Sequence, residues 1–182
     1  MTGCRGRVAA LLFVAALAAG VAVPANAVLS DVGPNGFVVT VRHELKATPR
    51  RTWEALGEVD RWWNGQHSWS GSAANLSLGR RAGDCFCERW AAGSVEHGRV
   101  VMALEDKLLR LDAALGPLQA LGVRGILSFA IATAEGRTVL VITYRVSGGD
   151  KAGLQELSGP VDGVIAEQAR RLAAWIDTGK PD

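Results

Sequence analysis

Hydrophobic and polar positions alternate along 36–46, the first clear pattern in the chain. Phe37, Val39 and Val41 fall on one face of an extended backbone, and polar residues such as Arg42 fall on the other. This period of two is typical of a strand that buries one face. The pattern therefore predicts a β-strand at this position.

Further short segments rich in β-branched and aromatic residues follow, separated by brief turns that contain glycine and acidic residues. Short connections favour antiparallel neighbours, because a parallel pair needs a long crossover. We therefore expect one antiparallel sheet. Its further predicted strands are 75–78, 85–91, 96–104, 108–113, 125–132 and 138–146.

Helical periodicity is present after the first strand and again near the C-terminus. Thr48 is a candidate N-cap with Pro49 at the first helical position, and 60–64 indicates a second short helix or turn. A long amphipathic helix is predicted to begin near Ser158 and Pro160. Its apolar stripe contains Val161, Val164, Ile165, Gln168, Leu172 and Trp175.

The predicted order is a strand, two short helices, a run of strands and one long helix. An antiparallel sheet with helices on one face is an α+β arrangement of layers. If the sheet curls around the long helix, the space between them forms a groove or cavity.

This order, together with particular residues, resembles the START-like or SRPBCC superfamily, which includes polyketide cyclase-like proteins and lipid-transfer domains. The resemblance covers 36–178. It implies a helix-grip fold, in which a curved antiparallel sheet wraps around the C-terminal helix and a hydrophobic or amphipathic ligand lies between them. It supplies no universal catalytic set. It rests on 47–53, the Trp62–Trp63 pair, the turn at Gly83, the strand 108–111 and the helix 160–176.

The first 27 residues have the pattern of a secretory leader. Arg5 and Arg7 form a positive start, 8–23 is apolar, and 25–27 is an A-x-A cleavage site. The apolar run falls short of the roughly 20 residues that span a bilayer, and Pro24 interrupts it. We therefore expect export to the periplasm or the medium, without a transmembrane anchor after cleavage.

The mature chain is predicted to start at Val28 and to form one domain over 36–178, between an N-terminal segment 28–35 and a tail 179–182. Without the leader, which holds two arginines and no acidic residue, the formal net charge falls from +2 to zero. No cluster of lysine and arginine remains. Nucleic-acid binding is not expected, because it needs a basic face that neutralises phosphates.

Three residues are candidates for acid or base chemistry: Glu88, His67 and His97. Glu88 lies between Phe86 and Trp90 in a predicted strand, so an inward carboxyl would be desolvated and its pKa raised. An outward Glu88 would be a solvated cross-strand partner. His67 is a base candidate near neutral pH, or a loop histidine packed beside tryptophans. His97 starts the next predicted strand. It either pairs across the sheet with the strand that carries Glu88 or is an ordinary strand-end histidine.

Aromatic, apolar and amide side chains are candidates for ligand contact. The stretch 116–119 is apolar yet contains Pro117, which favours a bend or a short helical lid over a central strand. Gln168 interrupts the apolar stripe of the last helix, so its amide needs a partner inside the protein. The predicted ligand-binding residues are Trp63, Trp69, Phe86, Trp90, Leu118, Gln119, Val164 and Gln168.

Cys85 and Cys87 are the cysteines that remain after cleavage. An exported protein favours a disulfide, but Cα atoms two residues apart on a regular strand are nearly 7 Å apart, so a bridge needs a bulge or bend. Buried free thiols are the alternative. These cysteines with His67 and His97 are donor types that zinc accepts, but the spacing does not match common zinc motifs, so no metal is expected.

Two functions are compatible with these observations. One is an exported binding protein for a small hydrophobic molecule or lipid; the other is a cyclase, dehydratase or hydrolase in which Glu88 and a histidine act as acid and base. The sequence contains no G-x-S-x-G elbow, phosphate-binding glycine loop, dinucleotide fingerprint or H-E-x-x-H pair, and no cofactor is expected. It leaves the oligomeric state open.

Overall fold

The computed structural model describes residues 27–182. The predicted leader and its cleavage site lie outside the described residues, except for Ala27. No helix in the described part of the chain is long and apolar enough to cross a membrane.

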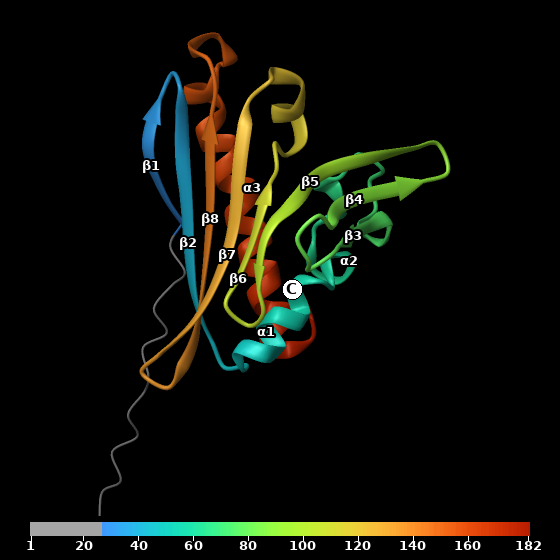
Figure 1. The fold of residues 1–182 in the computed structure, drawn as a ribbon, viewed down its shortest axis with the longest axis vertical. Coiled ribbons are helices and arrows are strands. Elements are labelled where there is room, and N and C mark those ends of the chain that lie inside the picture. Colours follow the sequence, from blue (N-terminus) through green and yellow to red (C-terminus); the bar gives the residue numbers. More distant parts are fainter. Residues whose placement is uncertain (1–26) are drawn as a thin grey trace, which may run out of the picture.

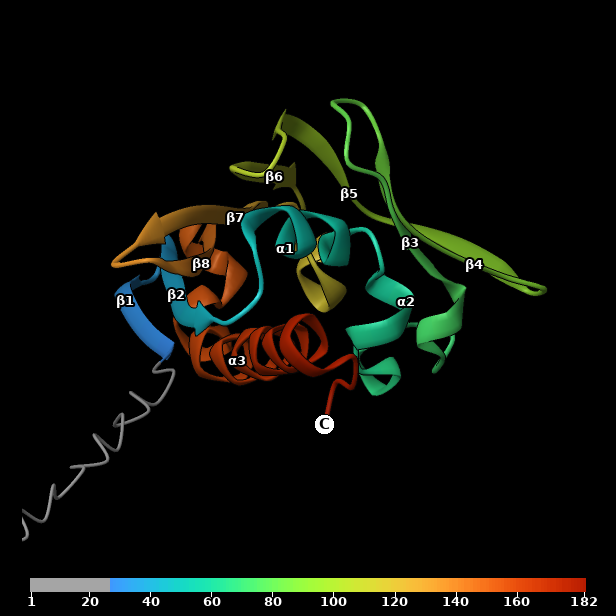
Figure 2. The same ribbon diagram turned by 90° about the horizontal axis from the view of Figure 1, so that it is seen from below.

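All the strands belong to one antiparallel sheet with the order β1-β2-β8-β7-β6-β5-β4-β3. The sheet bends around α3, while β3, β4 and β5 project away from the other strands as an arm (Figures 1 and 2). The strands are β1 (Ala27–Gly33), β2 (Gly36–Leu45), β3 (Leu76–Leu78), β4 (Cys85–Trp90), β5 (Gly93–Leu104), β6 (Leu108–Asp112), β7 (Arg124–Ala134) and β8 (Arg137–Ser147).

The helices cover one face of this sheet. The long helix α3 (Leu154–Thr178) runs beside β1 and β2, and α1 (Pro49–Leu56) and α2 (Val59–Trp62) fill the side nearest the arm (Figure 2). Within residues 27–182, short 3₁₀ helices occur at η1 (Gly65–His67), η2 (Ala73–Asn75), η3 (Gly116–Leu121) and η4 (Asp150–Ala152). The α+β class and the helix-grip architecture expected from the sequence are therefore confirmed.

Local rules explain why α1 begins where it does. The Thr48 side chain accepts a hydrogen bond from the Arg51 amide at 3.2 Å, and Pro49 occupies the first helical position, where its missing N–H costs nothing. At the other end of the chain, the Asp177 carboxylate accepts hydrogen bonds from the Lys46 and Ala47 amides at 2.9 and 3.0 Å. These bonds attach the end of α3 to the end of β2.

The predicted start of the last helix was wrong. The helix begins at Leu154, and Pro160 lies inside it rather than at its first turn. Sequence reasoning places a proline at a helix start because an interior proline removes one backbone hydrogen bond. Here Leu154 and Ser158 are buried against the rest of the protein, and this packing extends the helix in front of the proline.

The strand β1 was absent from the sequence prediction, which described 28–35 only as an N-terminal segment. Its pairing with β2 runs from Ala27↔Val41 to Gly33↔Gly36, with an irregularity after Ser30. The exposed Asp31 has a positive φ of 52°, which breaks the regular alternation that predicts strands.

The pairing of β4 with β5 contains a bulge. Phe86 pairs with Gly98 but Cys87 pairs with Glu96, so His97 is an extra residue in β5. A bulge rotates the side chains of the strand, and both His97 and Gly98 are buried as a result. The bulge thus places His97 in the interior of the protein, beside β4.

Candidate functional site

A cavity of about 330 Å³ lies between α3 and the sheet. Its walls come from five places: the loop around η1, His97 in the β5 bulge, the start of η3, Tyr144 in β8, and the first half of α3. Pro160, Val161, Val164 and Ile165 make the α3 wall apolar. This apolar cavity, partly open to solvent, is the main candidate site.

Tryptophans line the cavity next to the loop around η1. The Trp63 indole donates a hydrogen bond from Nε1 to the His67 carbonyl at 3.0 Å, which fixes the indole and the loop relative to each other. Trp69 also lines the cavity and is 58% exposed, so much of its side chain remains in contact with solvent. An exposed aromatic ring at the edge of an apolar cavity offers a contact surface for a flat or apolar molecule.

Glu88 is fully buried behind this wall and holds three groups together. Its carboxylate accepts hydrogen bonds from the Trp69 amide at 3.1 Å and the Ser70 amide at 2.6 Å, and contacts His97 Nε2 at 2.9 Å. The face of β4 that carries Phe86 and Glu88 is thus the inward one. Glu88 does not itself line the cavity. It contacts two residues that do, Trp69 and His97, and holds them in place.

The expectation that burial raises the pKa of Glu88 was wrong in its net direction. Burial does push the pKa of this carboxyl upward, but the hydrogen bonds from Ser70, Trp69 and His97 outweigh it and hold the pKa below the usual value of 4.5. Burial also lowers the pKa of His97, although the carboxylate of Glu88 opposes this. At neutral pH the pair is therefore an anionic Glu88 and a neutral His97.

A second network holds the η1 loop on α3. His67 Nε2 lies 2.9 Å from a Glu167 carboxylate oxygen, and the other oxygen accepts a hydrogen bond from Asn64 Nδ2 at 2.6 Å. The hydrogen bond from Asn64 lowers the pKa of Glu167, and His67 adds to the effect. His67 lines the cavity, but its Nε2 is engaged with Glu167 rather than free for a ligand.

Gln168 supports the same loop and does not line the main cavity. Its Oε1 accepts a hydrogen bond from the Asn64 amide at 2.8 Å. Its Nε2 is buried and has no hydrogen-bond partner among residues 27–182. It borders a separate void of about 10 Å³, large enough for one water molecule. The sequence argument for an inward amide was sound, but the amide belongs to the helix–loop contact.

Tyr144, which the sequence analysis did not select, fixes the opposite wall. Its hydroxyl donates to the Ala113 carbonyl at 2.9 Å and accepts from the Leu115 amide at 3.0 Å, just before η3. Burial raises the pKa of Tyr144 to about 12, so the phenol stays protonated. The only sequence signal was its position on the inward face of a strand, which is shared by many core residues.

Gly125 has no side chain, so the Ala113 carbonyl and the Tyr144 hydroxyl can pack closely against it. We expect Gly125→Ala to lower the free energy of unfolding by about 2 kcal/mol. A Cβ atom there would overlap the Ala113 carbonyl and lie 2.7 Å from the Tyr144 hydroxyl. Chemical denaturation measures the loss. Gly149→Ala is the control, because its Cβ would meet no atom within 4 Å. Equal stability of the two variants would contradict this packing.

The structure places four of the eight predicted ligand-binding residues in the lining of the cavity. They are Trp63, Trp69, Leu118 and Val164. Phe86 lies behind its wall, between Trp63 and His97, with ring centroids 5.4 and 5.0 Å away. Trp90 and Gln119 are not in its lining: Trp90 pairs with Gly93 where β4 and β5 join, and the Gln119 amide donates to the Glu96 carbonyl. Other lining residues that sequence reasoning missed are Leu157, Pro160 and Val161.

Cys85 and Cys87 are joined by a disulfide, which decides between the alternatives that the sequence left open. Their Cα atoms are 5.4 Å apart, shorter than on a regular strand, and the irregular pairing with β5 lies between them. Glu96 lies close to both sulfurs, within 4.8 Å. Because the sulfurs are bonded to each other, they offer no thiolate to a metal ion.

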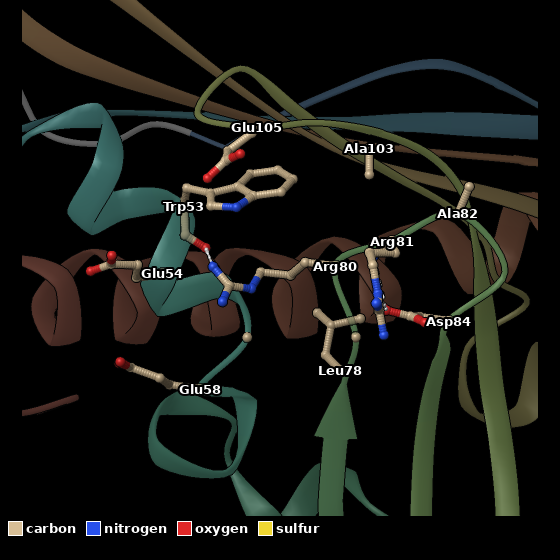
Figure 3. A pocket seen from close by; sticks show the side chains of 12 residues that line it. Trp53, Glu54, Glu58, Leu78, Arg80, Arg81, Ala82, Asp84, Ala103 and Glu105 are labelled. Carbon is tan, nitrogen blue, oxygen red and sulfur yellow. Dashed lines mark hydrogen bonds and ion pairs between the residues drawn. The ribbon is translucent and has the colours of Figure 1, made fainter.

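A larger and more open groove of about 980 Å³ lies between α1 and the segment that joins β3 to β4 (Figure 3). Arg80 crosses it, donates a hydrogen bond to the Trp53 carbonyl at 3.0 Å and stacks over the Trp53 ring. Glu54, Glu58 and Glu105 face the same space. This groove carries charges of both signs, so it suits an apolar molecule less well than the cavity does.

Comparison with solved structures confirms the helix-grip fold expected from the sequence. The Aha1 dimer from Colwellia psychrerythraea matches with a TM-score of 0.58 and 17% identity, over 79% of this chain and 98% of that one. CalU16 from Micromonospora echinospora matches with a TM-score of 0.58 and 13% identity, over 87% and 86%. A conserved protein of unknown function from Enterococcus faecalis, EF2215, matches with a TM-score of 0.56 and 14% identity, over 84% and 78%.

These similarities concern the fold, because the sequences are distant. No known sequence family matches this chain, and no curated protein matches it either.

Proposed function

We propose that this protein binds a small hydrophobic or amphipathic molecule in the cavity between α3 and the sheet. The observation that carries the proposal is the apolar lining of a partly open cavity of about 330 Å³, with Trp69 left exposed at its edge. Affinity would come from burial of apolar surface, at about 25 cal/mol per Å². The helix-grip fold supports this reading, since such folds often bind ligands at this place.

We further propose that the protein works after export, as the leader pattern predicts. Cleavage before Val28 would leave β1 almost complete, because Val28 pairs with Thr40 and Leu29 with Val39. A disulfide between Cys85 and Cys87 is compatible with an oxidising compartment.

Native mass spectrometry of the exported protein, purified without detergent, tests the proposal first. We expect a discrete extra mass that is lost on denaturation, on a chain that begins at Val28 and carries the disulfide. The purified, ligand-stripped protein should then bind N-phenyl-1-naphthylamine, a neutral apolar dye, with a rise in its fluorescence. A protein that carries no extra mass and does not bind the dye would refute the proposal.

A second function, acid or base catalysis on the bound molecule, is favoured by one observation. His97 lines the cavity, and its Nε2 lies 2.9 Å from the buried carboxylate of Glu88. A histidine held by a carboxylate is a common arrangement for a general base. In such an enzyme His97 would transfer the proton, and Glu88 would hold the imidazole ring in position. Glu88 would then not itself be the acid in contact with substrate.

A further inference from the structure

The polar atoms around the cavity are mostly engaged within the protein. The Tyr144 hydroxyl bonds to Ala113 and Leu115, and the Trp63 indole N–H bonds to His67. His67 Nε2 contacts Glu167, and the Ser68 hydroxyl donates to the Gly65 carbonyl at 2.7 Å. These engaged atoms stabilise the walls. The side-chain amide of Gln66 and Nδ1 of His67 also border the cavity and have no hydrogen-bond partner among residues 27–182, but both residues are exposed to solvent.

His97 differs from His67 in burial rather than in the ring nitrogen that it leaves free. Both have an Nδ1 without a partner in the described part of the chain, but the side chain of His67 is 34% exposed, whereas that of His97 is buried. The His97 side chain is 6% exposed and lines the cavity, and Nε2 is directed to Glu88. Nδ1 forms no hydrogen bond with any residue in 27–182, and it is not among the buried atoms enclosed without a partner. Nδ1 of His97 is therefore the more buried of the two ring nitrogens that remain for a molecule in the cavity.

The tautomer of His97 follows from its neighbour. An ionised carboxylate accepts hydrogen bonds only, so Nε2 must carry the proton that points to Glu88. The imidazole is neutral at pH 7, because burial lowers the pKa of His97 in spite of the neighbouring carboxylate of Glu88, which acts in the opposite direction. In a neutral imidazole with a protonated Nε2, Nδ1 is an acceptor.

The charged groups that contact the histidines of the lining are carboxylates. Among residues 27–182 no lysine or arginine lines the cavity, whereas Glu88 lies directly behind His97 and Glu167 directly behind His67. A ligand carboxylate or phosphate would therefore enter an apolar space without a cation to pair with, at a high desolvation cost. Fatty-acid-like anions do not suit this site.

We propose that the ligand is a neutral molecule that carries a hydroxyl group, an alcohol or a phenol, which donates a hydrogen bond to Nδ1 of His97. This inference rests on the proposed function of the cavity and names the chemical class that the cavity selects. The cavity of about 330 Å³ is at the small end of ligand sites, which suits a compact molecule of one or two rings or a short chain.

Competition against bound N-phenyl-1-naphthylamine tests this selection with four probes of one shape: 2-naphthol, 2-methoxynaphthalene, naphthalene and 2-naphthoate. One hydrogen bond to a buried acceptor corresponds to about tenfold in affinity. We expect 2-naphthol to bind about tenfold tighter than 2-methoxynaphthalene and naphthalene, and 2-naphthoate to bind weakest. The comparison uses the wild-type protein, so it does not depend on a variant that folds.

His97→Phe should remove the preference for 2-naphthol over 2-methoxynaphthalene, measured as the ratio of the two affinities within the variant. His43→Phe is the matched control, because His43 lies outside the cavity lining, and it should keep the preference. Equal affinities of 2-naphthol and 2-methoxynaphthalene for the wild type, or tightest binding of 2-naphthoate, would overturn the inference and leave the proposed function intact. Failure of the dye and of every probe to bind would instead refute the proposed function.

Discussion

Replacing Glu88 by glutamine is expected to lower the free energy of unfolding by about 3 kcal/mol at neutral pH, measured by chemical denaturation. The carboxylate accepts from the Trp69 and Ser70 amides with different oxygens, and His97 contacts one of them. A glutamine side chain has one acceptor oxygen, so its NH₂ group would face an N–H donor inside the protein. The loop that carries Trp69 should loosen as a consequence.

The pH dependence of this loss has a definite sign. The pKa of Glu88 is lowered in the folded protein, so its contribution to stability is present above the usual pKa of 4.5 and is lost as pH falls through the lower folded pKa. The stability difference between wild type and Glu88→Gln should therefore shrink below pH 4.5. His97, whose pKa is also lowered, makes the folded state less stable as pH falls below 6.5.

Glu44→Gln is the matched control for this substitution. Glu44 forms an ion pair with Arg42 at 2.8 Å, with both side chains about half exposed. Exposed pairs contribute little, so we expect a change within about 0.5 kcal/mol. If Glu88→Gln were as mild as Glu44→Gln, Glu88 would not hold the cavity wall. In the catalytic alternative, Glu88→Gln would also abolish turnover while dye binding persisted.

Replacing Val164 by tryptophan is expected to weaken binding of N-phenyl-1-naphthylamine by about seventyfold. Val164 lies on the α3 wall of the cavity and is partly exposed. An indole there would fill part of the cavity, so the dye would lose roughly 100 Å² of apolar contact. At about 25 cal/mol per Å², this corresponds to about 2.5 kcal/mol of binding free energy. That free energy corresponds to the stated loss in affinity. A fluorescence titration measures it.

Arg170→Trp is the control, since Arg170 lies on the exposed side of the same helix and should leave the dye affinity unchanged. Thermal unfolding of both variants shows whether α3 tolerates the substitutions. Undiminished binding to a folded Val164→Trp protein would place the dye site elsewhere, with the groove beside Trp53 and Arg80 as the next place to examine.

Much of the fold could be predicted because its signals are local. Alternation over 36–46 indicated β2, Thr48 and Pro49 marked the start of α1, and the apolar stripe identified the C-terminal helix. Side chains on alternating or helical positions face the core for reasons that involve only neighbours along the chain. The inward cavity residues Trp63 and Val164 followed from the same patterns.

The site itself required tertiary structure. No pattern in the neighbouring sequence shows that β5 contains an extra residue. This bulge nevertheless places His97 beside Glu88 and shifts the register of the pairing between β5 and the segment with Cys85 and Cys87. The direction in which the pKa of Glu88 shifts likewise depends on the amides of Trp69 and Ser70, which lie 19 and 18 residues away in the chain.

The sequence by itself determined the layers of this protein: an antiparallel sheet, two short helices and a long amphipathic helix, because periodicity and capping are properties of adjacent residues. The tertiary structure decided which polar groups meet. It paired Glu88 with His97, placed Gln168 on the η1 loop rather than in the cavity, and brought Tyr144 to the opposite wall. Hydrogen bonds between distant segments depend on register and bulges, which only the assembled sheet fixes.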